Sequence, residues 1–151
     1  MHRRSTTSSR LGWAWLLFVA ALAIHVADEA VNDFLSVYNP NARVIRARFP
    51  LIPIPIFTLH SFIVTLGLAI LVLLCLSPLA FRESPKLRRI AIPLSIVVGI
   101  GNGLMHLGSS IYFSRWMPGV FSSPLLLLSG IFLLSSALYP RHRPNAQAAG
   151  L

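Results

Sequence analysis

The sequence predicts an all-α membrane protein whose helices form a bundle of four transmembrane spans. Of its 151 residues, 55% are hydrophobic and only 11% are charged, whereas soluble domains carry about 25% charged residues. Apolar segments long enough to cross a bilayer recur along the chain, and short basic clusters separate them. We expect one compact bundle, because no linker sets off a second domain.

The net charge of +9 argues for membrane topology rather than for nucleic-acid binding. The 13 basic residues lie between the apolar segments instead of on one face of a folded domain, and no nucleic-acid-binding motif is present. Basic clusters of this kind are typical of the loops between membrane spans. The expected partner is therefore the lipid bilayer, and no nucleic acid is expected.

The elements follow in order from this alternation of apolar and basic segments. We predict a basic N-terminal tail (1–10), a four-helix transmembrane domain (11–140) and a polar C-terminal tail (141–151). The four spans are expected at about 11–31, 57–80, 90–113 and 120–139.

The first span has an alternative interpretation as a signal peptide. Its basic start, its apolar core and the pattern Ala21-Leu22-Ala23 resemble a signal peptide that is cleaved before Ile24. Cleavage would leave the polar stretch that follows at a new N-terminus, outside any spanning helix. The N-terminal residue of the mature protein decides between the two interpretations.

The longest connection contains prolines, and the third span contains glycines, and each set predicts a local structure. In the connection 32–56, Pro50, Pro53 and Pro55 cannot continue a helix, so an extended path at the membrane interface is expected. In the third span, Gly99 and Gly103 form a small-xxx-small pattern, which lets two membrane helices approach closely.

The basic residues also predict the orientation, because four spans put both termini on one side of the membrane. That side has nine basic residues: Arg3, Arg4, Arg10, Arg82, Lys86, Arg88, Arg89, Arg141 and Arg143. The other side has four: Arg43, Arg46, Arg48 and Arg115. The positive-inside rule therefore predicts cytoplasmic termini and a multi-pass protein of the cell membrane.

A polar stretch follows the first apolar run and holds three of the four acidic residues of the chain. Its polar side chains are those of His25, Asp28, Glu29, Asn32 and Asp33. On a helix they fall within an arc of roughly 140°. Ionisable groups are costly against lipid tails, so this face is expected to look into the bundle.

Polar side chains of two other spans are expected at the same depth. His25 lies roughly 21 Å along the first span, while Asn102 and His106 lie roughly 18 and 24 Å along the third. His60 lies in the first turn of the second span. All of these groups fall in the outer half of a hydrocarbon core of about 30 Å, which predicts one shared polar site.

Three interpretations of this site remain open: a metal site, a metal-free network of ion pairs, and a substrate or proton site. In the first, the ligands are His25, Glu29, His106 and His60, a donor set that suits zinc or iron with an open position for water. Asp28 and Glu29 are the candidate catalytic carboxylates, and such a water acts in hydrolysis or hydration. Asn102 is placed to orient a ligand or substrate.

In three motifs the chain resembles the HXXEE family of small membrane proteins, whose function is uncharacterised. Residues 25–29 read His-Val-Ala-Asp-Glu where the family has His-x-x-Glu-Glu. Residues 102–106 match Asn-x-x-x-His in full, and residues 116–122 read Trp-Met-Pro-Gly-Val-Phe-Ser where the family has Tyr-x-Pro-Gly-x-x-Thr. The resemblance implies a site that includes His25, Glu29, Asn102 and His106, but no reaction, and it disfavours signal cleavage.

Asp28 and Trp116 are departures from these motifs. Asp28 keeps the charge of glutamate but has a shorter reach by one methylene group. Trp116 has no phenol, so a proton transfer by the family's tyrosine would be absent here. Trp116 stays a candidate for substrate contact, and it also suits an anchor at the membrane interface.

The function expected first is that of a metal-dependent membrane enzyme that acts on a lipid-like substrate. One alternative is a small ion- or proton-coupled transporter, in which the same carboxylates and imidazoles bind a cation transiently. The other is a structural membrane protein whose polar network fixes how the helices pack.

Overall fold

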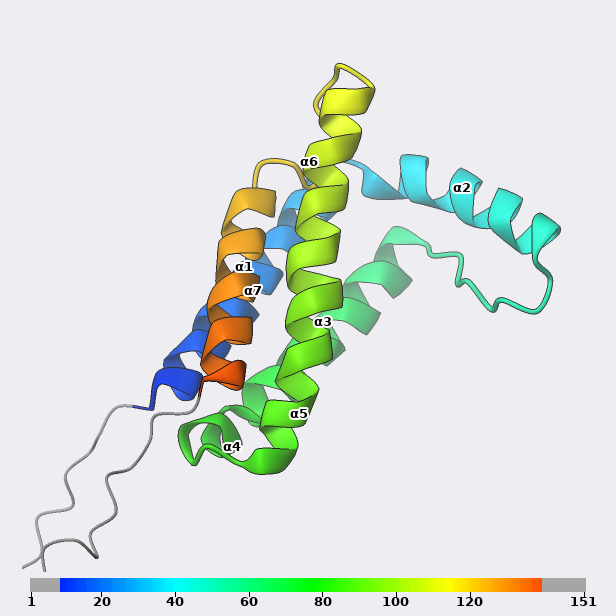
Figure 1. Cartoon of the computed structure of the whole chain (residues 1–151). Coiled ribbons are helices and arrows are strands. Elements are labelled where there is room, and N and C mark those ends of the chain that lie inside the picture. The colour runs from blue at the N-terminus through cyan, green and yellow to red at the C-terminus, as the bar shows by residue number, and fades with distance from the viewer. Residues whose placement is uncertain (1–8, 140–151) are drawn as a thin grey trace, which may run out of the picture.

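The computed structural model describes residues 9–139, and this part of the chain is all-helical, without a strand (Figure 1). Its elements are α1 (Arg10–Val31), α2 (Phe34–Arg48), α3 (Leu59–Cys75), α4 (Ser77–Phe81), α5 (Pro85–Leu94), η1 (Ser95–Gly101), α6 (Asn102–Tyr112) and α7 (Ser123–Leu138). The predicted all-helical class is confirmed. Of the two predicted tails, residues 1–8 and 141–151 lie outside the described residues.

Three helical segments are long and apolar enough to cross a membrane. They are Arg10–Val31, Leu59–Phe81 and Pro85–Tyr112, with 22, 23 and 28 residues. The apolar helix α7 has only 16 residues, or roughly 24 Å of rise, against a hydrocarbon core of about 30 Å. The described chain therefore has three long apolar helices and one short one, where four spans were expected.

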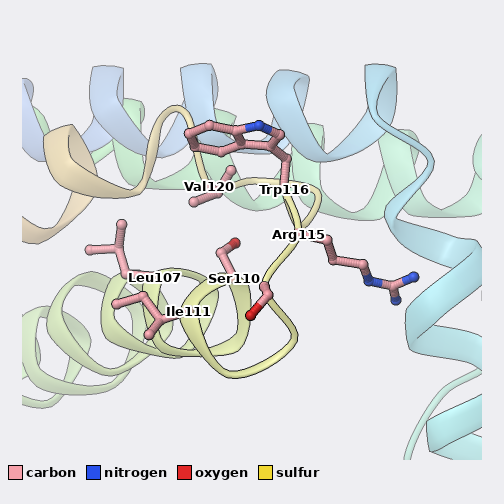
Figure 2. A pocket seen from close by; sticks show the side chains of 7 residues that line it. Leu107, Ser110, Ile111, Arg115, Trp116 and Val120 are labelled. Atoms are coloured by element: carbon pink, nitrogen blue, oxygen red, sulfur yellow. The ribbon is translucent and has the colours of Figure 1, made fainter.

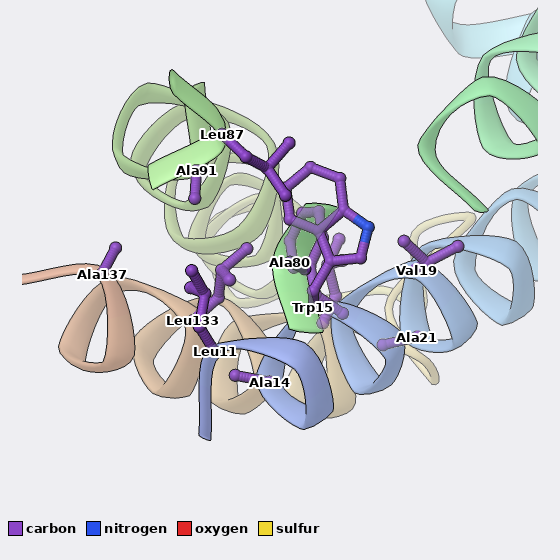
Figure 3. Packing of buried hydrophobic residues seen from close by; sticks show 12 residues of the cluster. Leu11, Ala14, Trp15, Val19, Ala21, Ala80, Leu87, Ala91, Leu133 and Ala137 are labelled. Carbon is purple, nitrogen blue, oxygen red and sulfur yellow. The ribbon is translucent and has the colours of Figure 1, made fainter. Parts of the chain in front are cut away.

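The helix α1 is central, because α3, α4 and α7 all pack against it. Its N-cap is Ser9, whose side chain accepts a hydrogen bond from the backbone N–H of Gly12. Its first half carries Leu11, Trp15 and Phe18 into a buried cluster with Leu87 and Leu133 (Figure 3). The indole Nε1 of Trp15 donates a hydrogen bond of 2.9 Å to the carbonyl oxygen of Leu73, which fixes the end of α3 on α1.

Two glycines bring the third long helix against α7. A Cβ atom on Gly99 would lie 2.7 Å from the Cα of Gly130, and one on Gly103 would lie 3.2 Å from the Cβ of Leu127. Only a glycine allows the first contact, because real Cβ atoms essentially never come so close. The close helix approach predicted from Gly99 and Gly103 is thus observed.

The connection between α1 and α3 differs from the extended path that was predicted. It begins with α2, a helix that tolerates Pro40 in its interior, and residues 53–58 have no regular secondary structure. The side chain of Asn39 holds this segment to α2, because its Nδ2 donates to the carbonyl oxygen of Phe57 at 2.8 Å and its Oδ1 accepts from the Phe57 N–H at 3.1 Å.

The start of α1, the helix α4 and the end of α7 lie at one end of the bundle, while α2 and the turn between α6 and α7 lie at the other (Figure 1). Two arginines hold the first end together. Arg10 Nη2 donates to Ser135 Oγ at 3.1 Å, and Arg88 Nη1 donates to the carbonyl oxygen of Ala137 at 3.1 Å. The predicted site residues of α1 and α6 lie toward the opposite end.

Candidate functional site

The polar stretch predicted to look into the bundle forms one face of α1. His25, Asp28 and Glu29 follow the i, i+3, i+4 spacing that puts side chains on the same side of a helix. His25 and Glu29 are buried, with relative exposures of 0% and 5%. The helix α6 faces them with Asn102 and His106, which are also one turn apart.

The carboxylate of Glu29 lies between two imidazoles. Its Oε1 is 3.1 Å from His106 Nε2 and 3.6 Å from His25 Nε2. The two rings meet edge to face, with centroids 4.9 Å apart. His25, Glu29 and His106 each offer one ligand atom, and these three atoms lie within 4.8 Å of one another.

Asn102 and Ser122 determine which nitrogen of His25 carries its proton. Asn102 Nδ2 lies 3.0 Å from His25 Nε2, and because an amide nitrogen can only donate, Nε2 accepts this hydrogen bond. The proton of neutral His25 is then on Nδ1, which lies 2.9 Å from Ser122 Oγ. A lone pair of His25 Nε2 is therefore directed toward Asn102 and Glu29.

Ser122 connects His25 to Asp28. Its hydroxyl donates to Asp28 Oδ2 at 2.7 Å, and its backbone N–H donates to the same oxygen at 2.9 Å. Asn32 Nδ2 donates to the other carboxylate oxygen, Asp28 Oδ1, at 2.7 Å. The carboxylate of Asp28 is thus occupied on both oxygens, and it holds His25 through Ser122.

The donor set of His25, Glu29 and His106 fits a metal ion. Within residues 9–139, His106 Nε2 is buried and makes no hydrogen bond, although Glu29 Oε1 is nearby. The lone pair of His25 Nε2 accepts from Asn102 in this structure, so a metal ion bound to this nitrogen would replace that hydrogen bond. Two imidazoles and one carboxylate form a common ligand set for zinc and for ferrous iron.

Gly119 closes the site on the side of the α6–α7 turn. Its φ of +83° is in the region that favours glycine. A Cβ there would lie 2.9 Å from His106 Cε1 and 3.1 Å from Glu29 Cγ. The backbone of Gly119 therefore packs directly on two of the three candidate ligands.

Two cavities reach the cluster, one through His25, Glu29 and Asn102 and the other through His106. One, of about 590 Å³, has almost entirely apolar walls from α1, α3, α5 and η1, and it ends at His25, Glu29 and Asn102. The other, of about 290 Å³, lies under α2 and reaches His106 beside Tyr38. Of the two cavities that include residues of the cluster, one is therefore large and apolar, and the other is smaller and has polar groups in its wall.

Two candidates from the sequence lie away from the cluster. His60 is exposed in the first turn of α3, and it is not among the residues whose ligand atoms converge. Trp116 is 77% exposed, stacks on Phe121, and lines a separate pocket with Leu107, Ser110 and Val120 (Figure 2). His25, Asp28, Glu29, Asn102 and His106 are brought together.

Sequence reasoning did not place Ser122 and Gly119 in the site. Both belong to the third motif, Trp-x-Pro-Gly-x-x-Ser, so the signal was present in the sequence. The motif reads naturally as a turn followed by a helix start, and nothing in its spacing shows that the turn folds back onto α1. The contact between Ser122 and Asp28 joins residues 94 positions apart.

The fold and the site place the chain among all-helical proteins of membrane type that enclose a buried histidine–carboxylate cluster. A family model described as "protein of unknown function with HXXEE motif" matches residues 15–133. The chain belongs to this family, as its three motifs indicated. No curated protein and no solved structure matches it.

Proposed function

We propose that the protein is a metal-dependent membrane enzyme with His25, Glu29 and His106 as the ligands of zinc or iron. The observation that carries this proposal is the convergence of three buried donor atoms within 4.8 Å, in which His106 Nε2 lies 3.1 Å from Glu29 Oε1. A bound metal of this kind supplies Lewis-acid activation of water or of a substrate carbonyl, as hydrolysis or hydration requires.

The neighbouring residues have separate roles in this proposal. Asp28 orients His25 through Ser122, as carboxylates commonly do for metal-binding histidines. This contact favours a positioning role for Asp28 over that of a free base. Asn102 faces the large cavity beside His25, where its amide is placed to bind a polar group of the substrate.

A lipid-like substrate is supported by the walls of the large cavity. Glu29 is the one charged residue that lines it, and most of the other lining side chains are aliphatic. In this proposal, water reaches His106 through the smaller cavity beside α2, and this is supported by the polar residues Tyr38, Asn41 and Ser109 in its wall. The two cavities thus suit an apolar substrate and a water molecule that meet at one cluster.

The proposed location is the cell membrane, with the chain crossing it several times and both termini in the cytoplasm. The long apolar helices support this, as does the excess of basic residues on the termini's side of the sequence-based topology, where nine lie against four on the other side. The short helix α7 is then the fourth span, and its length requires local thinning of the bilayer or support from its neighbours.

Metal content tests the proposal, and His60 provides a matched control. We expect about one zinc or iron per chain in detergent-purified wild-type protein and in His60→Gln, with most of it lost in His106→Gln. Elemental analysis by mass spectrometry measures this directly. A wild-type protein that takes up neither added zinc nor added iron, and whose folding is unchanged by a chelator, would contradict the proposal.

A proton- or ion-coupled transporter is the second candidate, and the hydrogen bonds of His25 favour it. They form a chain from Asn102 at the cavity through His25 and Ser122 to Asp28. Its part from His25 through the Ser122 hydroxyl to Asp28 is able to pass a proton, whereas the Asn102 amide only donates a hydrogen bond to His25. In proteoliposomes, ion- or pH-dependent flux that is lost in Glu29→Gln supports transport, whereas a loss of assembly alone in that variant supports a structural network.

A further inference from the structure

The cavity between α1, α3 and η1 has the shape and chemistry of a binding site for an alkyl chain. Its walls include Leu22 of α1, Ala69 and Leu73 of α3, and Leu94 and Val98 of the third long helix. Along α3 it extends from Thr65 to Leu73, which corresponds to roughly 12 Å of helix rise. The polar residues in its wall are His25, Glu29, Thr65 and Asn102, and the other lining residues are apolar.

The helix α3 leaves this cavity accessible from the side. Phe62 is the buried residue of α3, and the side chains along the rest of the helix are at least partly exposed. The helix packs on α1 at its inner end, where Trp15 binds the Leu73 carbonyl. Leu68 and Val72 of α3 line the cavity and are both more than half exposed, so the cavity is open to the surface of the protein along α3.

The charge of the lining selects the kind of head group. Glu29 is the charged residue in the cavity wall, and no lysine or arginine lines it. In the metal-free protein, in which the inference is tested, an anionic head group would meet a carboxylate without a basic partner, which is unfavourable in a low-dielectric site. Asn102 offers an amide instead, which suits a neutral head group such as an ester, amide or alcohol.

We infer that the cavity binds a neutral amphiphile that enters from the bilayer between α3 and η1. Its alkyl chain lies along Ala69 and Val98, and its polar end lies at Asn102 and His25. This inference deepens the proposed function, because it states where the apolar part of the substrate lies. It does not depend on a metal, since the binding of the chain is measured without turnover.

A pair of tryptophan variants on α3 tests the inference. Ala69 lines the cavity, whereas Gly67, two residues earlier, has no atom within 4 Å of the position of its Cβ. Ala69→Trp fills the cavity, and Gly67→Trp adds the same side chain in open space. Both positions are exposed, so neither variant disturbs the buried core of the protein.

The probe is a long-chain fatty alcohol with a photoreactive diazirine, in nanodiscs of phosphatidylcholine. We expect labelling of cavity-wall peptides that contain Leu22 and Val98, reduced about tenfold in Ala69→Trp and unchanged in Gly67→Trp. Equal labelling in the two variants, or labels spread evenly over the exposed faces of α3 and α7, would overturn the inference. Labelling that persists in metal-free His106→Gln separates this result from the metal test.

Discussion

At the scale of single residues, the hydroxyl of Ser122 determines the state of His25. It accepts from Nδ1 and donates to Asp28, so His25 keeps a lone pair on Nε2 that is directed toward Asn102 and Glu29. Helical periodicity was enough to predict that His25, Asp28 and Glu29 share a face. It could not predict the partner of that face, because Ser122 comes from a turn that is distant in the sequence.

Replacing Ser122 tests this link. In Ser122→Ala, the Nδ1–H of His25 and one oxygen of Asp28 lose their shared partner, and a buried group left unsatisfied costs about 1–3 kcal/mol. Loss of such an orienting contact also weakens metal binding by about 10–100-fold. Thermal unfolding in detergent and zinc titration measure the two effects.

Ser122→Thr is the matched control, because it keeps the hydroxyl and adds one methyl group. We expect it to retain both the stability and the zinc affinity of the wild-type protein. Equal losses in the alanine and threonine variants would show that packing, and not the hydroxyl, is what matters at this position.

At the scale of elements, the π-helix η1 directs Asn102 toward α1. Its wider turns occupy the seven residues before Asn102, next to the close contact between Gly99 and Gly130. Wide turns of this kind occur frequently at functional sites. The sequence indicated the close approach of helices through its glycines, but helical periodicity assumes a regular helix and therefore does not reveal η1.

The contact between η1 and α7 predicts a specific sensitivity at Gly130. A Cβ in Gly130→Ala would lie 2.8 Å from the Cα of Gly99 and 3.2 Å from the backbone nitrogen of Ile100. These are backbone atoms, which cannot rotate away, so we expect a destabilisation of about 1–3 kcal/mol. Circular dichroism during thermal unfolding measures it.

Gly108 of α6 provides the comparison for this variant. No atom lies within 4 Å of its Cβ position, and alanine has a higher helix propensity than glycine by up to about 1 kcal/mol. Gly108→Ala is therefore expected to be neutral or stabilising. A Gly130→Ala protein that unfolds at the same temperature as Gly108→Ala would contradict the close contact.

Two other differences from the sequence-based expectation concern the tilt of α3 and the presence of the helix α2. The rise per residue put His60 at the depth of the site, but rise does not give the tilt of a helix, and the start of α3 leans away from α6. The helix α2 was missed because Pro40 and three arginines resemble a polar loop. Its arginines are exposed, and such a helix suits the membrane interface.

At the scale of the whole molecule, large apolar side chains cover much of the outer surface. Leu68 and Val72 of α3, Val97 of η1, and Leu128 of α7 are each more than half exposed. A soluble protein rarely exposes apolar surface over such an area, whereas a bilayer favours it. These exposed apolar side chains and the three long apolar helices agree with the membrane environment that the composition predicts.

Reporter fusions test the proposed orientation. We expect green fluorescent protein at the C-terminus to fluoresce and alkaline phosphatase at the same position to be inactive, because the positive-inside rule places this end in the cytoplasm. A phosphatase fused after α2 should be active instead. The reverse pattern would place the termini outside, and identical behaviour at both positions would mean that the chain crosses an even number of times between them, and not the three expected.

The contacts of His25 also have a consequence for how the protein is made. His25 is separated from Asn102 by 77 residues and from Ser122 by 97. At ordinary rates of synthesis, Ser122 leaves the ribosome roughly 5 to 20 s after His25. During that interval the acids of α1 have already been made, but their partners have not.

Until these partners are synthesised, the nascent first helix must therefore remain where a charged face is tolerated, such as beside the insertion machinery or at the lipid head groups. Arrival of the turn before α7 supplies the last hydrogen bonds. Membrane insertion and folding are thus completed by the same turn. In a chain truncated before Ser122, the first helix lacks these hydrogen bonds and is not stable in the bilayer.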